Sequence, residues 1–185
     1  MDASAKMPNS APPSSSLTIA ILALNEASLI YHCLQSASFA DQLLVIDSGS
    51  TDSTPEIAHS FGADVYCYPD WQGFAIQRTR ALKHCRCDYL FFLDCDETIP
   101  SELAEEIRNV IAQGTATRGL IRWDDHVCGK RIRGAHQTKG VARLFKANNV
   151  IRFEGQVHES AIFQSPPKSI LLQTRLIHHS RRSIH

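Results

Sequence analysis

Two acidic side chains, separated by one residue, follow an apolar run in the middle of the chain. Asp94 and Asp96 come directly after the run 89–93, which is typical of a buried strand, and Glu97 follows them. Carboxylates at the exit of a strand suit a hard divalent cation that also keeps phosphate oxygens and water in its shell. We therefore expect Asp96 and Asp94 to bind Mg²⁺ or Mn²⁺. Acids at such a position also cap helices, and this alternative stays open.

Two further polar segments follow predicted strands. The pair Asn25-Glu26 comes after one apolar run, and the segment 47–52 comes after another. Small residues let the backbone approach a ligand, and free N–H groups at the start of a helix favour phosphate or ribose oxygens. Asn25, Glu26, Asp47 and Ser48 are therefore candidate substrate-binding residues. Ordinary turns and helix caps use the same residue types.

The charge balance argues against a nucleic-acid partner. Nineteen acidic residues offset nineteen basic ones, so the chain has no overall basic field. Basic residues nevertheless gather between positions 130 and 152. This stretch is suited to phosphates or to a membrane surface, and equally to a solvated face. Its members are Lys130, Arg131, Arg133, Lys139, Arg143, Lys146 and Arg152.

The cysteines predict a reduced compartment. There are six cysteines, and the first sixteen residues lack the apolar core of a secretory signal. Cys85 and Cys87 lack the paired spacing of a structural zinc site, which needs four converging ligands. No apolar run approaches the ~20 residues that span a bilayer. We therefore expect a cytoplasmic protein with free thiols and no membrane span.

Strands and helices are predicted to alternate through the first part of the chain. Residues 1–16 are rich in Pro, Ser and Ala and are predicted to be disordered. The alternation favours a parallel sheet with helices on both faces, in which ligands bind beyond the carboxyl ends of the strands. The three polar clusters should therefore meet at one edge. The predicted strands are 17–24, 43–46, 63–68 and 89–93, and the predicted helices are 26–38, 55–61, 73–85 and 102–112, the last capped by Ser101.

Past residue 114 the pattern becomes β-rich. The segments 120–123, 141–145, 160–163 and 170–178 are predicted strands. We therefore divide the chain into an α/β half at 17–115 and a β-rich half at 116–185. The last residues carry no helix stop signal, and we expect the chain to be a piece of something longer.

Three segments resemble family 2 glycosyltransferases in their order and separation. They are Leu17 to Glu26, Val45 to Asp52 and Leu90 to Glu97, and the resemblance covers roughly residues 17–115. Further segments are similar to the branch that contains the lipopolysaccharide core β-1,4-glucosyltransferases. These further segments are Trp71 to Leu82, Gly129-Lys130, Arg143 to Phe145 and Val157 to Glu159.

The resemblance implies a GT-A-like fold, with a Rossmann-related, mostly parallel sheet flanked by helices. In such a fold the α/β half at 17–115 would bind the nucleotide sugar, and the β-rich half at 116–185 would lie on the acceptor side. The resemblance also implies a UDP-hexose donor, a lipid-linked saccharide acceptor such as lipopolysaccharide core, and Asp96 as the more direct metal ligand. Arg78, Arg80 and Arg143 are further candidates for substrate binding. A lipid-linked acceptor permits peripheral contact with the inner face of the cell membrane. Many relatives have a second acid where this chain has Ser48, so base recognition there is in doubt.

An inverting transfer needs a carboxylate to take the proton of the acceptor hydroxyl. Glu159 is the first candidate, and Asp125 with its neighbour Asp124 are the alternatives. A competing hypothesis is an inactive or truncated nucleotide-sugar-binding remnant. Another is a nucleotidyltransferase, which would want a Gly-rich loop with a basic residue after the first strand, where this chain has Ala23 to Glu26.

Overall fold

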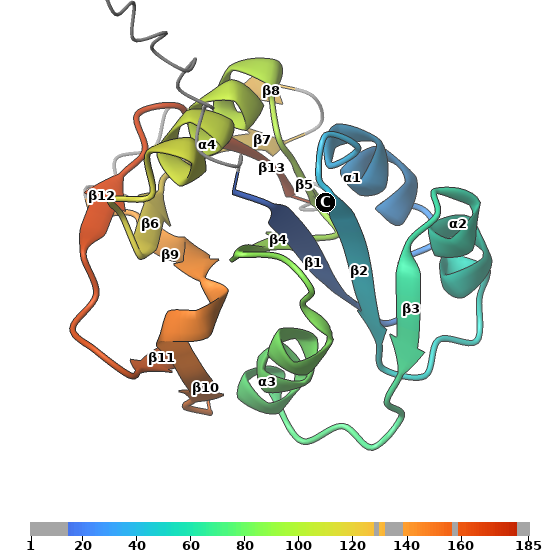
Figure 1. Cartoon of the computed structure of the whole chain (residues 1–185). Helices are drawn as coiled ribbons and strands as arrows, with labels where there is room; N and C mark the ends of the chain where they lie inside the picture. The colour runs from blue at the N-terminus through green and yellow to red at the C-terminus, as the bar shows by residue number, and fades with distance from the viewer. Residues whose placement is uncertain (1–14, 128–129, 132–138, 157–158, 181–185) are drawn as a thin grey trace, which may run out of the picture.

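The computed structural model describes residues 15–127, 130–131, 139–156 and 159–180 of the 185-residue chain (Figure 1). The predicted disordered tail therefore lies outside the described residues, except for its last two positions. The helices are α1 (Ile30–Ser36), α2 (Thr54–Ser60), α3 (Phe74–His84) and α4 (Ser101–Gln113), with a 3₁₀ turn at Ala147–Asn149. The strands are β1 (Leu17–Ala23), β2 (Gln42–Asp47), β3 (Asp64–Cys67), β4 (Tyr89–Asp94), β5 (Glu97–Thr98), β6 (Arg118–Ile121), β7 (Trp123–Val127), β8 (Lys130–Arg131), β9 (Val141–Lys146), β10 (Val150–Glu154), β11 (Ser160–Phe163), β12 (Ser169–Leu171) and β13 (Leu176–Ser180).

A seven-stranded sheet forms the centre of the fold, in the order β12-β6-β9-β4-β1-β2-β3. The four strands β3, β2, β1 and β4 are parallel neighbours, as the alternation of strands and helices predicted. β9 is antiparallel to both β4 and β6, so the sheet is mixed on its other side. The parallel strands all end at one edge, and this edge carries the three polar clusters.

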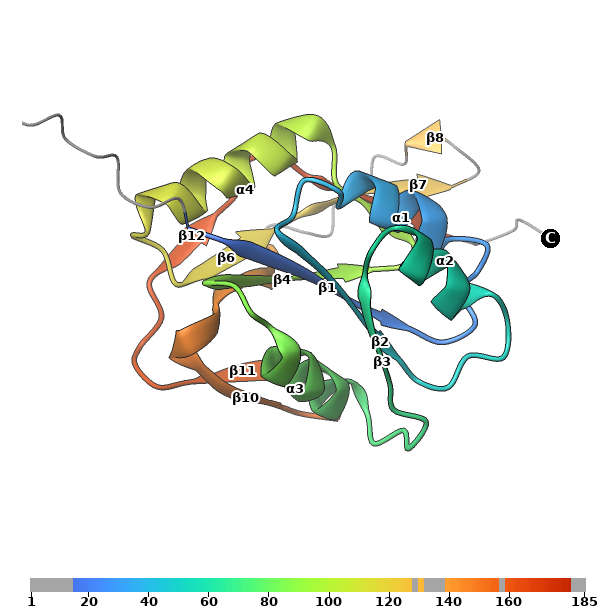
Figure 2. The same ribbon diagram turned by 45° about the vertical axis from the view of Figure 1, so that its right-hand side comes forward.

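Helices cover both faces of this sheet. Figure 2 shows α1, α2 and α4 on one face, and α3 with the β10–β11 hairpin on the other. Successive side chains of a strand point to opposite faces, so β1 contributes to two cores. Leu17, Ile19 and Ile21 pack into the cluster that includes the apolar residues of α1 and α4, while Ala20 joins the cluster under α3. This two-sided burial explains why β1 and β4 read as continuous apolar runs.

Two predicted helix starts are wrong. The first helix was expected from residue 26 but begins at Ile30, because the preceding residues form a turn in which the Leu29 and Ile30 N–H groups both bond the Glu26 carbonyl oxygen at 2.9 Å. Ser101 does not cap α4. It is the first helical residue, and its hydroxyl bonds the adjacent Glu102 carboxylate at 3.2 Å, while Pro100 occupies the cap position.

The β-rich half divides among three sheets. β6, β9 and β12 extend the central sheet, β10 pairs with β11, and a four-stranded sheet has the order β5-β13-β7-β8. The predicted strand 170–178 is two strands in different sheets. The N–H groups of Gln173 and Thr174 bond the carboxylate of Glu106 on α4 at 2.7 and 2.9 Å, which takes the chain out of one sheet before it enters the next.

The cysteines of the described residues are free thiols, and Cys85 donates to Thr18 Oγ1 at 3.3 Å. Cys33 and Cys95 are buried next to Asp94 and Asp96, and burial raises the pKa of Cys33 well above its ordinary value. In the part of the chain that the structure describes, no helix has the length and apolar character to cross a membrane.

Candidate functional site

A pocket of about 850 Å³ lies beyond the carboxyl ends of the parallel strands. The register places Ala23 opposite Asp47 and Leu22 opposite Asp94, so the loops that follow β1, β2 and β4 are neighbours. The volume is near the upper end of the ~300–1,000 Å³ range of ligand pockets. Seven of the predicted site residues line it: Glu26, Ser48, Arg78, Asp94, Asp96, Arg143 and Glu159.

The other four predicted site residues do not line the pocket but support it. Asn25 and Asp47 organise the first two loops, Arg80 supports the loop before α3, and Asp125 bonds a histidine that faces the pocket. The pocket draws on both halves of the chain, because Arg143, Glu159 and His178 come from the β-rich half.

Asn25 connects the loop after β1 to the loop after β2, and Asp47 holds the second of these loops in shape. Asn25 has a left-handed φ of 55°, and its side-chain oxygen accepts the Thr51 N–H at 2.8 Å. Asp47 accepts the N–H groups of Gly49 and Ser50 at 3.0 and 2.9 Å. The expectation that the N–H groups of this loop are free for phosphate is therefore wrong for these three residues. The loop instead fixes the position of Ser48.

Ser48 is held by a chain of polar contacts that begins at the surface. Asp70 and Arg80 form an ion pair at 2.5 Å, and Arg80 Nη1 donates to Gln77 Oε1 at 3.0 Å. Because that oxygen accepts from Arg80, the Gln77 amide nitrogen faces Ser48 and donates to its hydroxyl oxygen at 2.9 Å. Gln77 is fully buried. This chain of contacts fixes the Ser48 hydroxyl at the pocket.

Asp94 and Glu97 share one buried arginine. Nη2 of Arg143 lies 2.6 Å from Asp94 Oδ2 and 2.8 Å from Glu97 Oε1. Trp123 Nε1 donates to the same Glu97 oxygen at 2.6 Å, and the Arg143 guanidinium lies 5.3 Å from the Trp123 ring centre. This network joins β4, β5, β7 and β9, and therefore the two halves of the chain.

Burial and charge act in opposite directions within this network. Burial raises the pKa of Glu97 to about 7, against the attraction of Arg143. Burial also acts to raise the pKa of Asp94, but the Arg143 guanidinium outweighs it and keeps that pKa below its ordinary value. The charges of Arg78 and His178 lower the pKa of Asp94 further, whereas the charge of Asp94 raises the pKa of Glu97 further, and this accounts for the difference. Asp94 thus presents an ionised carboxylate to the pocket.

Asp96, His178 and Asp125 form a second polar series beside the first. His178 Nε2 lies 3.3 Å from Asp96 Oδ2, and His178 Nδ1 lies 3.0 Å from Asp125 Oδ1. Burial lowers the pKa of His178, but the hydrogen bond with Asp125 and the charge of Asp96 raise this pKa by more than burial lowers it, so the net shift is upward. A histidine whose other ring nitrogen bonds a carboxylate is a typical metal ligand.

The described residues contain no preformed cluster of three or more His, Cys, Asp or Glu side chains around one point. Asp96 and His178 nevertheless offer an oxygen and a nitrogen side by side, with Asp94 in the same pocket. Mg²⁺ and Mn²⁺ are commonly held by one or two carboxylates, with phosphate oxygens and water completing the shell. The residues present therefore fit a cation that arrives with a diphosphate.

Arg78 and Arg143 bring buried positive charge to the pocket. The Arg78 guanidinium stacks 4.8 Å from the Phe92 ring centre, and burial together with the charge of Arg143 lowers the pKa of Arg78. Across the described residues, neither Arg78 Nε nor Arg143 Nε and Nη1 has a hydrogen-bond partner. Buried donors without acceptors are unusual, so these N–H groups favour a ligand that supplies the acceptors.

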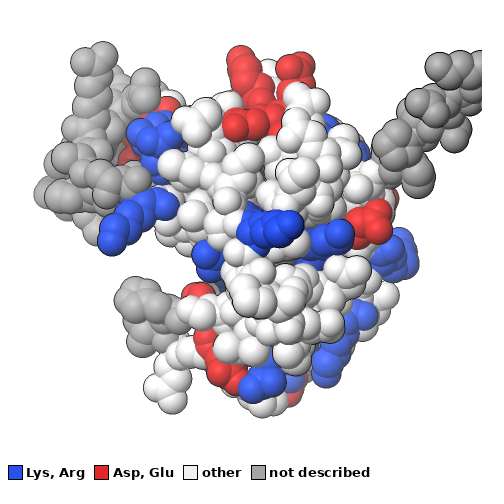
Figure 3. All heavy atoms as spheres, turned by 60° about the vertical axis from the view of Figure 1, so that its left-hand side comes forward, with Lys and Arg blue, Asp and Glu red and all other residues white. Residues whose placement is uncertain are grey.

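The basic stretch between residues 130 and 152 does not form one continuous basic surface in its described part. Arg143 is buried, and Arg152 pairs with Glu154 at 2.5 Å. Figure 3 shows Lys and Arg side chains scattered among uncharged ones on one face of the molecule. The side chains of Lys130, Arg131 and Arg133 lie outside what the structure describes.

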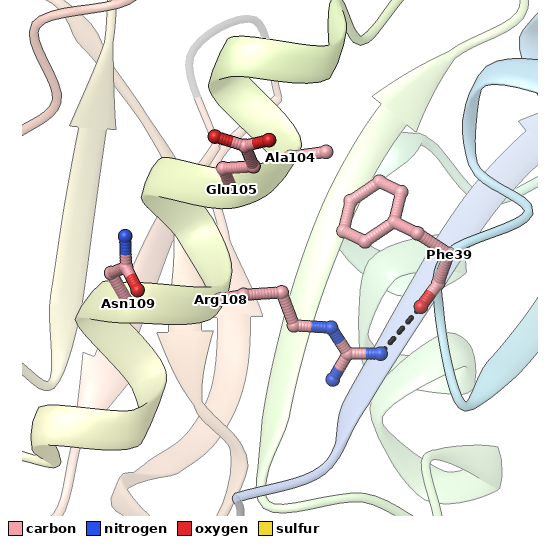
Figure 4. A pocket seen from close by; sticks show the side chains of 5 residues that line it. All are labelled: Phe39, Ala104, Glu105, Arg108 and Asn109. Atoms are coloured by element: carbon pink, nitrogen blue, oxygen red, sulfur yellow. Dashed lines mark hydrogen bonds between the residues drawn. The ribbon is translucent and has the colours of Figure 1, made fainter.

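Two smaller hollows lie outside this pocket. One, of about 590 Å³, lies between α1 and the β5–β13 pair and has Asp96 as its one predicted site residue. The other, of about 360 Å³, lies along α4, where Arg108 donates to the Phe39 carbonyl oxygen (Figure 4). Neither gathers the predicted chemistry. The second hollow is lined by Phe39, Ala104, Glu105, Arg108 and Asn109.

Sequence reasoning missed three side chains of the site. Gln77 is a polar residue on the buried side of a helix, and this was a usable signal. Glu97 was noted only as an acid beside the metal motif. His178 reaches Asp96 because β13 pairs with β5 and β7, and nothing near it in the sequence indicates these pairings.

Several curated relatives match part of the chain, and two of them show the range. A Rickettsia bellii protein described as an uncharacterized glycosyltransferase is 38% identical over 101 residues, which is 54% of this chain and 34% of that protein. The lipopolysaccharide core biosynthesis glycosyltransferase LpsC of Rhizobium meliloti is 30% identical over 115 residues, which is 60% of this chain and 42% of LpsC. The chain therefore spans about a third to two fifths of the length of these relatives.

The fold is shared with solved structures. S. aureus TarS 1–349, in complex with UDP-GlcNAc, superimposes with a TM-score of 0.70 at 15% identity, over 92% of this chain and 60% of that one. This likeness confirms the expected GT-A fold. The model of the family named Glycosyl transferase family 2 matches residues 18–162, which is more than half of the chain. On this match, and on the site that the same residues build, the chain belongs to glycosyl transferase family 2.

Proposed function

We propose that the pocket binds a nucleoside diphosphate sugar, first of all a UDP-hexose, and that the hexose is transferred with inversion to a saccharide acceptor. The observation that carries this proposal is the composition of the pocket. Carboxylates and buried arginines from both halves of the chain line one cavity, next to loops that suit a nucleoside. This combination matches a ligand with a sugar, two phosphates and a base.

The arginines suit the diphosphate. Guanidinium groups bind phosphate oxygens through several N–H donors at once, and a site that excludes water strengthens these bonds. Arg78 has a donor without an acceptor and lines the pocket, so it is the first candidate to hold the diphosphate. Arg143 acts chiefly on Asp94 and Glu97, to which its Nη2 is already committed.

Asp96 and His178 are the side chains that would hold Mg²⁺ or Mn²⁺, with Asp94 beside them. When bound, the cation would offset the negative charge that develops on the departing diphosphate. Asp125 orients His178 through Nδ1, which leaves Nε2 facing Asp96. In this proposal Asp125 is a positioning residue, which favours Glu159 over it as the base.

Glu159 takes the proton in the proposed transfer. The acceptor oxygen forms a bond with the anomeric carbon, the bond from that carbon to the diphosphate oxygen breaks, and the hydroxyl proton passes to the Glu159 carboxylate. Glu159 lines the same pocket as Asp94 and Asp96 and lies within electrostatic reach of Arg78. A general base of this kind accelerates a reaction by roughly 10²–10⁴-fold.

The acceptor is the outer part of the proposal. LpsC takes part in lipopolysaccharide core biosynthesis by its name, and this supports a lipid-linked saccharide as the acceptor class. An enzyme with such an acceptor would work at the inner face of the cell membrane, in peripheral contact with it. The loop after β1, Ala23 to Glu26, has no glycine and no basic residue, which speaks against a nucleotidyltransferase.

Calorimetry with UDP-glucose, with and without Mn²⁺, tests the donor site. We expect Mn²⁺ to strengthen binding to the wild-type chain and Asp96→Asn to remove that effect. Glu102→Gln, which changes an exposed acid on α4, is the matched control and should behave as wild type. If the affinity for UDP-glucose is the same with and without Mn²⁺, and the same in wild type and Asp96→Asn, the metal role is refuted. Binding without any donor hydrolysis or transfer would instead support an inactive nucleotide-sugar-binding remnant.

A further inference from the structure

Exposed apolar side chains gather at the mouth of the pocket. Seven large hydrophobic side chains among the described residues are exposed, and four of them line this pocket. Trp71 and Phe74, the two aromatic ones, are 49% and 50% exposed. Exposed apolar surface beside a polar cavity marks a binding site more often than chance. The other two are Leu24 and Val141.

We propose that Trp71 and Phe74 form an aromatic platform for a pyranose ring of the saccharide acceptor, in which one ring stacks on the sugar and the other, at a right angle to it, contacts the edge of the sugar. This inference rests on the proposed glycosyl transfer and names the acceptor subsite of the same pocket. One face of a pyranose presents C–H groups with slight positive charge, and the face of an aromatic ring is negative. The platform therefore suits a sugar ring better than a flexible chain of hydroxyl groups.

The aromatic pair is held in place before any ligand arrives. The ring centres of Trp71 and Phe74 are 5.0 Å apart, and the ring planes are at 90°. The backbone N–H of Trp71 donates to the Pro69 carbonyl oxygen at 3.0 Å, and the neighbouring Asp70 forms an ion pair with Arg80 at 2.5 Å. A rigid aromatic surface loses little entropy when it binds, which is an advantage for a weakly bound acceptor.

The platform lines the same pocket as the proposed base, Glu159. Phe74 and Arg78 are four residues apart on α3 and therefore lie on one face of the helix. Arg78 is in turn close enough to Glu159 to feel its charge. A sugar ring bound on Trp71 and Phe74 would thus lie near the proposed base. The nucleoside loops contribute Glu26 and Ser48 from the ends of β1 and β2 instead.

Saccharide binding can be measured directly by tryptophan fluorescence. The probes are methyl pyranosides of glucose, galactose and mannose, with sorbitol as an open-chain polyol that has hydroxyl groups but no ring face. We expect the pyranosides, and not sorbitol, to change the emission of the wild-type chain. Trp71→Phe should lose most of this response, because the remaining tryptophan, Trp123, is partly buried and bonded to Glu97. Ile76→Ala, an exposed apolar residue of α3 outside the pocket lining, is the matched control and should keep it.

Trp71→Ala and Phe74→Ala add the second measurement, which uses calorimetry with the same pyranosides because Trp71→Ala lacks the reporting tryptophan. Each should raise the pyranoside concentration at half-saturation roughly tenfold, a change of about 1.4 kcal/mol, while UDP binding with Mn²⁺ changes less than about twofold. A comparable loss of UDP binding would overturn the proposal, since the platform would then hold the nucleotide base. An unchanged response in Trp71→Phe, or no response to any pyranoside in wild type, would also overturn it. If UDP fails to bind even to wild type, the donor proposal fails, and the fluorescence titration still decides the platform.

Discussion

The two halves of the chain build the same pocket by different means. In the segment 17–115, parallel strands end at one edge, so the residues after β1, β2 and β4 meet because of the topology. In the segment 116–180, short strands join three sheets, and each site residue arrives through its own long-range pairing. A parallel sheet thus brings polar loops together at little cost, whereas the β-rich half must position Arg143, Glu159 and His178 one by one.

The comparison suggests a division of labour. Under the proposed function, the first half supplies the nucleoside loops, the metal-binding carboxylates and the aromatic platform. The second half supplies the base, His178 as a metal ligand and Asp125, which orients His178. Arg143 lies between the two, since it comes from β9 and binds carboxylates at the ends of β4 and β5. Substitutions in each half, and at this junction, should therefore separate binding, chemistry and stability.

Glu159→Gln should have the largest effect on activity. It removes the proposed base from the second half without changing the first, so transfer should fall roughly 10²–10⁴-fold. UDP binding with Mn²⁺ should be unchanged, because the nucleoside loops and Asp96 are intact. Steady-state transfer assays and calorimetry measure the two quantities. Full transfer activity in Glu159→Gln would show that another carboxylate is the base, and the roles proposed for the two halves would then be wrong.

Arg143→Ala should damage both halves at once. Removing one partner of a buried ion pair costs about 3–5 kcal/mol of stability. The pKa of Glu97, already raised to about 7, should rise further without the guanidinium. A carboxyl with a raised folded-state pKa stabilises the fold at low pH and loses that contribution as pH rises through this pKa. The destabilisation by Arg143→Ala should therefore grow as pH rises above about 7, where Glu97 ionises in wild type but has a higher pKa in the variant, as urea unfolding would show.

The double variant Arg143→Met/Glu97→Gln is the control for this prediction. It removes both charges and fills most of the same space, so it should be more stable than Arg143→Ala at about pH 8. A double variant no more stable than Arg143→Ala would mean that the lost packing against Trp123, and not the unpaired Glu97, is responsible.

The same contrast explains what the sequence predicted and what it did not. The runs that became β1 and β4 are apolar because they are buried on both faces, and polar residues at their ends predicted the edge where ligands bind. Hydrophobic pattern and parallel topology were enough for Asp94, Asp96, Glu26 and Ser48. All four line the pocket.

The β-rich half resisted prediction because its contacts are distant in sequence. The run 170–178 looks like one strand, and only the contact of Gln173 and Thr174 with Glu106 divides it. Arg143 was a candidate for substrate binding, and the sequence did not indicate that its Nη2 bonds Asp94 and Glu97. A buried arginine and an exposed one look the same in sequence, and the partner that distinguishes them lies more than forty residues away.

Ser48→Ala should have a moderate effect confined to the first half. It removes the hydroxyl that Gln77 presents to the pocket, and one hydrogen bond is worth about 1 kcal/mol, or roughly a fivefold weaker UDP affinity. The catalytic steps of the second half should be unaffected at saturating donor. Ser50→Ala is the matched control, because Ser50 bonds Asp47 in the same loop and does not line the pocket. Equal losses of UDP affinity in both variants would assign the effect to the loop and not to the Ser48 hydroxyl.

Asp41→Asn should have the smallest effect and should change stability alone. Asp41 lies at the opposite end of β2 from the pocket, where its carboxylate accepts from Arg108 Nη1 at 2.8 Å and from the Leu17 N–H at 2.7 Å. The hydrogen bond from Arg108 lowers the pKa of Asp41 below its ordinary value of 3.8. Because both side chains of the pair are partly exposed, the substitution should cost only about 0.5–1 kcal/mol.

The pH dependence gives this last prediction its sign. A carboxyl whose folded-state pKa is lowered stabilises the fold fully above its unfolded value, and it loses that contribution as pH falls below that value. The difference in unfolding free energy between wild type and Asp41→Asn should therefore be present at about pH 7 and shrink towards about pH 3. UDP binding should stay the same throughout, since neither Asp41 nor Arg108 lines the pocket. A change in UDP affinity would show that the site depends on the far end of the sheet, and the two halves would then be less separate than their geometry indicates.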